Sequence, residues 1–100
     1  MFDKDRYLTS GVQNTVPLPI QLILWKMIDD ARLQTELDYL QVFELKEITV
    51  EDMPMQEVVH FQEQPEYRTR LTFPFAEPIN TKLYIIDDGE YSTMLLPSER

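Results

Sequence analysis

The sequence predicts an α+β domain in which one amphipathic helix packs on a mainly antiparallel sheet of about five or six strands. Three observations predict it. One segment has helical apolar periodicity, several segments have strand-like composition, and an Asp-Gly pair lies between two strand-forming runs. A chain of 100 residues is near the commonest domain size, so we expect a single domain over residues 1–100.

A helix is predicted from about Pro19 to Leu33. Pro17 and Pro19 bracket its start, where a missing backbone N–H breaks no helical hydrogen bond. One stripe along the helix is apolar, because the following residues recur at helical spacing: Ile20, Ile23, Leu24, Met27, Ile28 and Ala31. The rest of the chain offers this stripe only strands to pack against.

Strands are expected on both sides of the helix. Residues 6–10 form a short strand that ends near Gly11, and residues 13–15 continue as a loop. Residues 37–45 are rich in strand formers and apolar on both faces, which predicts a strand that is covered on both sides or contains a bulge. Residues 49–55 are predicted to be a connection.

A first hairpin is predicted over residues 58–75. We expect Phe61 opposite Tyr67, with a loop of three residues, because the alternative register would place Phe61 against Arg68 and bury a charge. In the preferred register His60 faces Arg68 on the outer surface of the sheet.

A second hairpin is predicted over residues 83–96. Asp88-Gly89 forms its turn, since both residues tolerate positive φ, and this turn pairs Ile86 with Tyr91. The last four residues are a short polar tail.

The chain contains no cysteine, which excludes disulfides and cysteine-based zinc sites. No apolar run approaches the roughly 20 residues that a membrane span needs. The first residues lack the basic and apolar regions of a signal peptide, so we expect a cytoplasmic protein with no membrane partner.

The net charge is −9, and most of it lies in residues 37–66. This segment has Lys46 against eight carboxylates: Asp38, Glu44, Glu47, Glu51, Asp52, Glu57, Glu63 and Glu66. Phosphate backbones are bound by Lys and Arg, so this balance argues against nucleic acid as a partner. It favours solubility through self-repulsion, or an acidic face for a basic partner.

No catalytic motif and no cofactor site is recognised in the sequence. Asp87, Asp88 and Glu90 carry oxygen ligands that suit a divalent cation, but aspartates also suit tight turns, and the turn role is favoured. No metal site is therefore predicted. With a single histidine and no nucleophile motif, the sequence indicates a non-enzymatic protein.

Two functional hypotheses remain. The first is a protein-interaction or regulatory module that binds a protein partner or a second copy of itself. Its candidate residues lie on the helix flank and in the acidic segment: Trp25, Leu22, Glu44, Glu47, Glu51 and Asp52. The alternative is a small-molecule-binding protein or modest enzyme, in which His60, Arg68 and Arg70 surround an anionic ligand on the outer sheet face.

Several stretches resemble a small family from low-GC Gram-positive bacteria, known only as domain of unknown function nine hundred and sixty. They are Met1-Phe2, residues 6–12, 22–25, 37–45 and 86–96. The resemblance implies a bacterial, cytoplasmic, single-domain protein. It implies no activity, ligand or catalytic residue.

Overall fold

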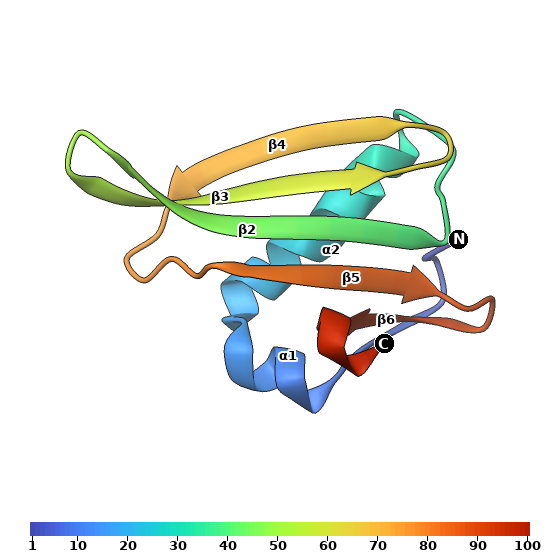
Figure 1. The fold of residues 1–100 in the computed structure, drawn as a ribbon. Helices are drawn as coiled ribbons and strands as arrows, with labels where there is room; N and C mark the ends of the chain where they lie inside the picture. Colours follow the sequence, from blue (N-terminus) through green and yellow to red (C-terminus); the bar gives the residue numbers. More distant parts are fainter.

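The computed structural model describes residues 1–100 and contains one six-stranded sheet with the strand order β1-β6-β5-β2-β3-β4 (Figure 1). All neighbouring strands are antiparallel except β1 and β6, which are parallel. The predicted α+β class with a mainly antiparallel sheet is confirmed. The elements are β1 (Asp5–Leu8), α1 (Ser10–Thr15), α2 (Leu18–Arg32), β2 (Leu40–Val50), β3 (Met53–Gln62), β4 (Tyr67–Pro74), β5 (Thr81–Asp87), β6 (Tyr91–Leu95) and the 3₁₀ turn η1 (Pro97–Glu99).

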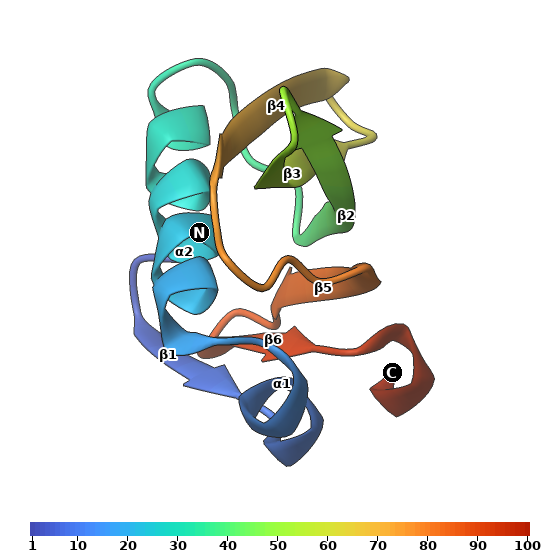
Figure 2. The same cartoon turned by 90° about the vertical axis from the view of Figure 1, so that its left-hand side faces the viewer.

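The predicted amphipathic helix corresponds to α2, which lies across one face of the sheet (Figures 1 and 2). Its stripe is buried, with Ile20, Leu24 and Ile28 fully inaccessible to solvent. The stripe packs in one core with residues from four strands: Phe43, Leu45, Val58, Leu83, Ile85 and Met94. Truncating a buried leucine or isoleucine to alanine at such a position costs about 2–5 kcal/mol, so this contact supplies much of the stability.

The prediction of a single helix was wrong, because α1 forms where a strand end and a loop were expected. Thr9 is its N-cap, and the Thr9 Oγ1 atom accepts a hydrogen bond of 3.2 Å from the Val12 N–H. Val12 is completely buried, so the short helix contributes to the core. Gly11 lies in its first turn instead of ending a strand.

The segment 49–55, predicted to be a connection, consists of the end of β2, the start of β3 and a tight turn of two residues between them. Val50 pairs with Met53 across a two-residue loop, and the loop residues Glu51 and Asp52 have φ values of 50° and 66°. Two successive left-handed residues are typical of a type I′ hairpin. The turn was not predicted from the sequence, because neither of its two central residues is glycine or asparagine.

The register of the β3–β4 hairpin differs by one residue from the prediction. Phe61 pairs with Arg68, and His60 pairs with Thr69. A one-residue slip moves every side chain of a strand to the other face. His60 therefore points toward α2 instead of outward, while Phe61 points outward, where the arginine is not buried.

The β5–β6 hairpin differs by two residues, and its faces are therefore as predicted. Ile86 pairs with Thr93, and the Asp88 N–H donates to the Tyr91 carbonyl. The turn residues are Gly89-Glu90, with Gly89 at φ 101°, one position later than expected.

Candidate interaction surface

The sheet face opposite α2 has no second layer, apart from η1 near its β6 side (Figure 2). We call the outward-pointing residues of β2 to β6 the outer face. Its apolar members come from four strands: Leu40, Val42, Val59, Phe61, Tyr84, Ile86 and Leu95. Val42 and Leu95 are only 6% and 8% exposed, because neighbouring side chains shield them. The structure thus carries a contiguous apolar strip on its uncovered side.

Strand β3 shows most clearly that this face is unusual. Its buried side carries the polar residues Gln56, His60 and Gln62 around Val58, whereas its outward side carries Val59 and Phe61 beside Glu57. A strand with one solvated face normally has the reverse arrangement. The apolar residues are therefore placed where water, or a partner, meets the sheet.

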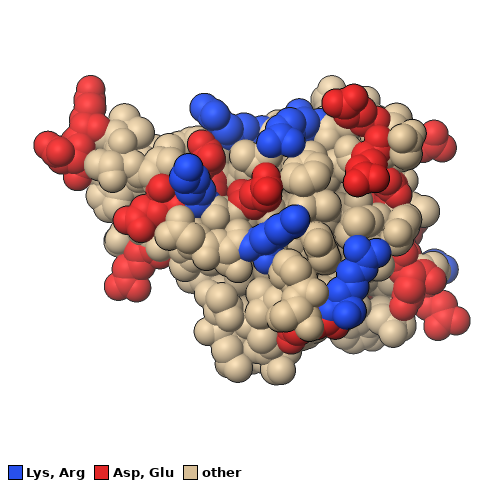
Figure 3. All heavy atoms as spheres, viewed as in Figure 1, with Lys and Arg blue, Asp and Glu red and all other residues tan.

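Cationic side chains border this strip. They are Lys46, Arg68, Arg70, Lys82 and Arg100, five of the nine Lys and Arg residues in the chain. The outward positions of the strands hold two carboxylates, Glu44 and Glu57, and Glu57 lies 3.6 Å from the Arg70 Nε atom. Figure 3 shows blue side chains spread over the upper and middle parts of this face, with a few red side chains among them. The face thus has the opposite charge to the molecule as a whole.

Two aromatic rings of the outer face, Phe61 and Tyr84, are covered by cations, whereas Tyr91 at the β6 end is exposed and packs edge-on against Tyr7. The Arg68 guanidinium lies 5.0 Å from the centroid of Phe61. Lys82 and Arg100 lie 5.6 Å and 5.5 Å from the centroid of Tyr84. Such contacts at exposed sites contribute about 0.5–1 kcal/mol each and hold the long side chains flat against the sheet.

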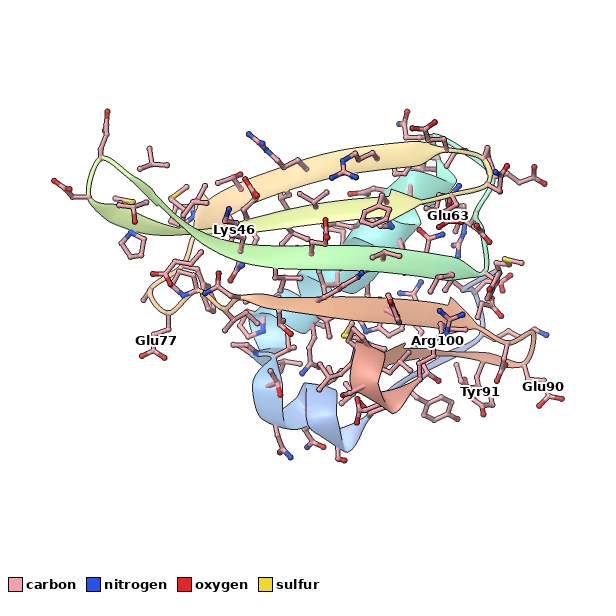
Figure 4. All side chains as sticks on the ribbon, viewed as in Figure 1. Lys46, Glu63, Glu77, Glu90, Tyr91 and Arg100 are labelled. Carbon is pink, nitrogen blue, oxygen red and sulfur yellow. The ribbon has the colours of Figure 1, made fainter.

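The acidic residues gather at the two ends of the sheet. In Figure 4, Glu77 lies at one end, Glu63 and Glu90 lie at the other, and Lys46 and Arg100 lie between them. Figure 3 shows the same separation, with red side chains concentrated at both ends. The outer face thus presents a band that is mainly cationic, although it includes Glu44 and Glu57, between two acidic ends.

The predicted acidic interaction residues do not share one surface. Glu44 is on the outer face opposite Lys82, while Glu51 and Asp52 form the tip of the β2–β3 hairpin. Glu47 is exposed, and its backbone N–H donates to Asn80 Oδ1. The segment that is continuous in sequence is thus divided among a sheet face, a hairpin tip and a loop contact.

The predicted grouping of His60 with Arg68 and Arg70 is not formed. His60 is fully buried between β3 and α2, whereas Arg68 and Arg70 lie on the opposite side of the sheet. The His60 ring stacks on Phe43, with centroids 4.3 Å apart and an interplanar angle of 13°. His60 therefore cannot share a ligand with the two arginines.

His60 belongs to a buried hydrogen-bond network with two glutamines. The Gln41 Nε2 group donates to Gln62 Oε1 at 2.7 Å and to the Asp38 carbonyl, so Gln41 Oε1 is the acceptor for His60 Nε2 at 2.6 Å. His60 is then the neutral Nε2–H tautomer, and its Nδ1 atom has no partner. Burial lowers the pKa of His60 from 6.5 to about 4, so the ring is uncharged at neutral pH.

The helix flank around Trp25 is partly covered. Trp25 is half-buried against the core, and the Arg6 guanidinium lies 4.9 Å from its ring. Arg6 is held there by Asp29, at 2.5 Å. Leu22 and Leu18 are 61% and 63% exposed on the same helix. Leu22 is thus the accessible residue of the predicted pair.

The aspartates of the β5–β6 turn have local partners. Asp87 Oδ1 accepts from the Gly89 N–H, and Asp88 Oδ1 accepts from the backbone N–H groups of Glu90 and Tyr91. These backbone hydrogen bonds lower the pKa of Asp88. No group of three histidine or acidic side chains has the geometry of a metal site.

Sequence reasoning missed the residues Phe61, Tyr84, Lys46, Lys82 and Arg100. One signal was present: Lys82, Tyr84 and Ile86 alternate with the buried Leu83 and Ile85, so both faces of this strand are partly apolar. The assembly of the cations, by contrast, depends on strand order, which brings β4 and β5 to either side of the β2–β3 hairpin.

Comparisons with known proteins give a family but no function. No helix of the structure has the length and apolar character of a membrane span. No curated protein matches the sequence. A solved structure described as "Crystal structure of the protein of unknown function from Enterococcus faecalis" is similar over 98% of this chain and 92% of that chain, with a TM-score of 0.80 and 25% sequence identity. The family model described as "Staphylococcal protein of unknown function (DUF960)" matches residues 5–99, and the chain belongs to this family of unknown function, as its sequence resemblance implied.

Proposed function

We propose that this protein is a non-enzymatic protein-interaction module whose outer face binds an acidic protein partner. The observation that carries the proposal is the apolar strip on the uncovered side of the sheet, bordered by five cations in a chain of net charge −9. Apolar residues at the centre of a surface and charged residues around them are the usual anatomy of a protein interface. Charge complementarity then selects a partner surface rich in Asp and Glu.

Two features favour a polypeptide over a nucleic acid. Single-stranded nucleic acids bind sheets by stacking bases on exposed aromatic rings. On the outer face, the central rings Phe61 and Tyr84 are already covered by Arg68, Lys82 and Arg100, and the exposed ring of Tyr91 lies at the acidic end of the sheet near Glu90 (Figure 4). The acidic rims at both ends also repel a polyanion that extends beyond the central band.

The cations also argue against a second copy of the chain on this face. A symmetric dimer formed face to face brings Arg68, Arg70 and Lys82 of the two copies together. Like charges opposed in an interface cost several kcal/mol. The alternative hypothesis, a small anionic ligand bound by His60, Arg68 and Arg70, is weakened because His60 is buried on the other side of the sheet.

The test is affinity capture from a lysate of a Gram-positive bacterium, followed by carbodiimide cross-linking, which joins lysine amines to carboxylates in direct contact. We expect one identified acidic protein to be retained, with cross-links from Lys46 or Lys82 to its Asp or Glu residues. The double variant Arg68→Glu/Arg70→Glu should lose this protein.

The matched control is Lys4→Glu/Lys26→Glu, which changes the net charge equally on exposed positions away from the outer face. This control should retain the partner. The proposal is overturned if no protein is retained, if both double variants behave alike, or if the cross-links come only from Lys4 and Lys26.

A further inference from the structure

Strand β4 is a free edge of the sheet, because it pairs with β3 alone. The direction of its backbone groups follows from one hydrogen bond. The Phe75 N–H donates to the Pro54 carbonyl at 3.3 Å, in line with the β3–β4 register. Hydrogen-bonded pairs alternate with non-bonded pairs along an antiparallel ladder. The odd-numbered residues of β4 therefore bond to β3, and Arg68, Arg70 and Thr72 direct their N–H and C=O groups outward.

Pro74 supports this assignment. It is an even-numbered residue of β4, so its nitrogen faces the free edge, and the missing N–H removes no bond of the ladder. Proline and arginine on an edge strand also discourage unwanted pairing with the edge strand of another molecule. A strand that pairs here must therefore compensate the positive charge.

The inward side of this edge is incompletely covered. Leu71 pairs with the fully buried Val58, yet Leu71 is 39% exposed. A groove of about 130 Å³ lies between α2 and β4. It is lined by Met27, Asp30, Tyr67, Thr69, Arg70 and Leu71.

We infer that an extended segment of the acidic partner adds to β4 as a seventh strand. This inference rests on the proposed function and specifies how the partner is held. Main-chain hydrogen bonds would form with Arg68, Arg70 and Thr72, as in other cases of strand addition. Because side chains alternate along a strand, acidic residues would lie beside Arg68 and Arg70 on the outer face, and apolar residues would enter the groove beside Leu71.

A second copy of the chain does not fit this edge equally well. Antiparallel pairing of β4 with β4 of another copy places Arg68 and Arg70 of both copies on one face within a few residues of each other. Directly opposed like charges destabilise a strand pair. The edge thus favours a strand with alternating acidic and apolar residues.

The experiment uses a synthetic peptide of the same eight-residue length as β4, alternating Glu with Val, and a control peptide of equal composition with its glutamates and valines in separate blocks. Binding is followed by amide NMR and hydrogen exchange on the full chain. We expect the alternating peptide to protect the amides of Arg68, Arg70 and Thr72, and the block peptide to leave them unprotected.

Thr72→Pro removes one outward N–H without removing a bond to β3, so it should weaken binding of the alternating peptide by about tenfold or more. Thr72→Val keeps the N–H and should bind as the unaltered chain does. Melting curves show whether Thr72→Pro is folded, and the protection of the three amides in the unaltered chain tests the inference without this variant.

The inference is overturned if the peptide does not bind, if it binds without protecting these amides, or if a folded Thr72→Pro variant binds unchanged. These outcomes are distinct from failure of the proposed function. A lysate partner lost by Arg68→Glu/Arg70→Glu but kept by Thr72→Pro would preserve the outer face as an interface and exclude strand addition.

Discussion

Arg68 and Phe61 face each other across β3 and β4, and the arginine guanidinium lies 5.0 Å from the centroid of the phenylalanine ring. This pair places a charge and an aromatic ring together on the uncovered side of the sheet. The contact hides part of the ring from water while the guanidinium remains solvated. It thereby reduces the cost of exposing an apolar residue that the interface is proposed to use.

Arg68→Ala should lower the free energy of unfolding by about 0.5–1 kcal/mol, since it removes an exposed cation–π contact. Urea denaturation measures this change. In a Phe61→Leu background the same substitution should have a smaller effect, because the ring is absent. Equal effects in both backgrounds would show that the two side chains are not coupled.

The pKa of His60 predicts a pH dependence of stability. Burial lowers the pKa of this ring from 6.5 to about 4 in the folded protein. Between these values the unfolded chain binds the proton and the folded protein does not, so acid favours unfolding. The contribution of the neutral His60 ring to the free energy of unfolding is therefore fully present above pH 6.5. It decreases by about 3 kcal/mol as the pH falls to about 4.

The measurement is urea unfolding at a series of pH values for the unaltered chain and for His60→Gln. The variant retains the titration of all carboxylates but lacks the imidazole. The difference in unfolding free energy between the two proteins should therefore change by about 3 kcal/mol between pH 6.5 and pH 4. A constant difference across this range would contradict the assignment of a neutral buried ring.

The turn of the β2–β3 hairpin offers a stabilising substitution. Glu51 and Asp52 have positive φ values, which Asn-Gly adopts more readily in a type I′ turn. Glu51→Asn/Asp52→Gly should raise the free energy of unfolding by about 1 kcal/mol. Glu51→Ala/Asp52→Ala removes the same charges but disfavours positive φ, so it should destabilise. If the two double variants melt alike, charge rather than backbone conformation governs this turn.

Gly11 lies against the carboxylate of Glu99. A Cβ atom at Gly11 would be 2.6 Å from Glu99 Oε2, and this carboxylate is held by the Thr9 hydroxyl at 2.6 Å and by the Leu96 N–H at 2.9 Å. These hydrogen bonds lower the pKa of Glu99. The C-terminal turn is thereby attached to the start of α1.

Gly11→Ala should leave the melting temperature nearly unchanged, because the gain of about 1 kcal/mol in helix propensity is offset when the exposed Glu99 carboxylate moves away from its donors. In a Glu99→Ala background, Gly11→Ala should instead raise the melting temperature. Stabilisation in both backgrounds would indicate that the Glu99 contact is dispensable.

Element types could be predicted from the sequence because they depend on local periodicity. The α2 stripe and most of the strand-forming runs were assigned correctly, since apolar spacing determines which local structure can bury them. The face of β3 could not be predicted in this way. Val59 and Phe61 resemble core residues, and only the pairing of Phe61 with Arg68 reveals that they point outward.

The candidate site was predicted only in part, for the same reason. Arg68 and Arg70 were identified as a pair on the outer face, and they are found there. Their companions Lys82 and Arg100 are distant in sequence and join them only through the order of the strands. His60 was assigned to the wrong side because a one-residue difference in loop length reverses every side chain of the strand.

The parallel pairing of β1 with β6 has a consequence for folding during synthesis. Asp5 pairs with Tyr91 and Leu8 pairs with Met94, so β1 has no strand to pair with until β6 has been translated. Until then the β2–β3–β4 meander can form from segments that are neighbours in sequence, while β1 remains unpaired. Ribosome-bound chains that stop before Tyr91 should therefore leave residues 5–8 open to proteases, and β1 should join the sheet only after β6 has left the ribosome.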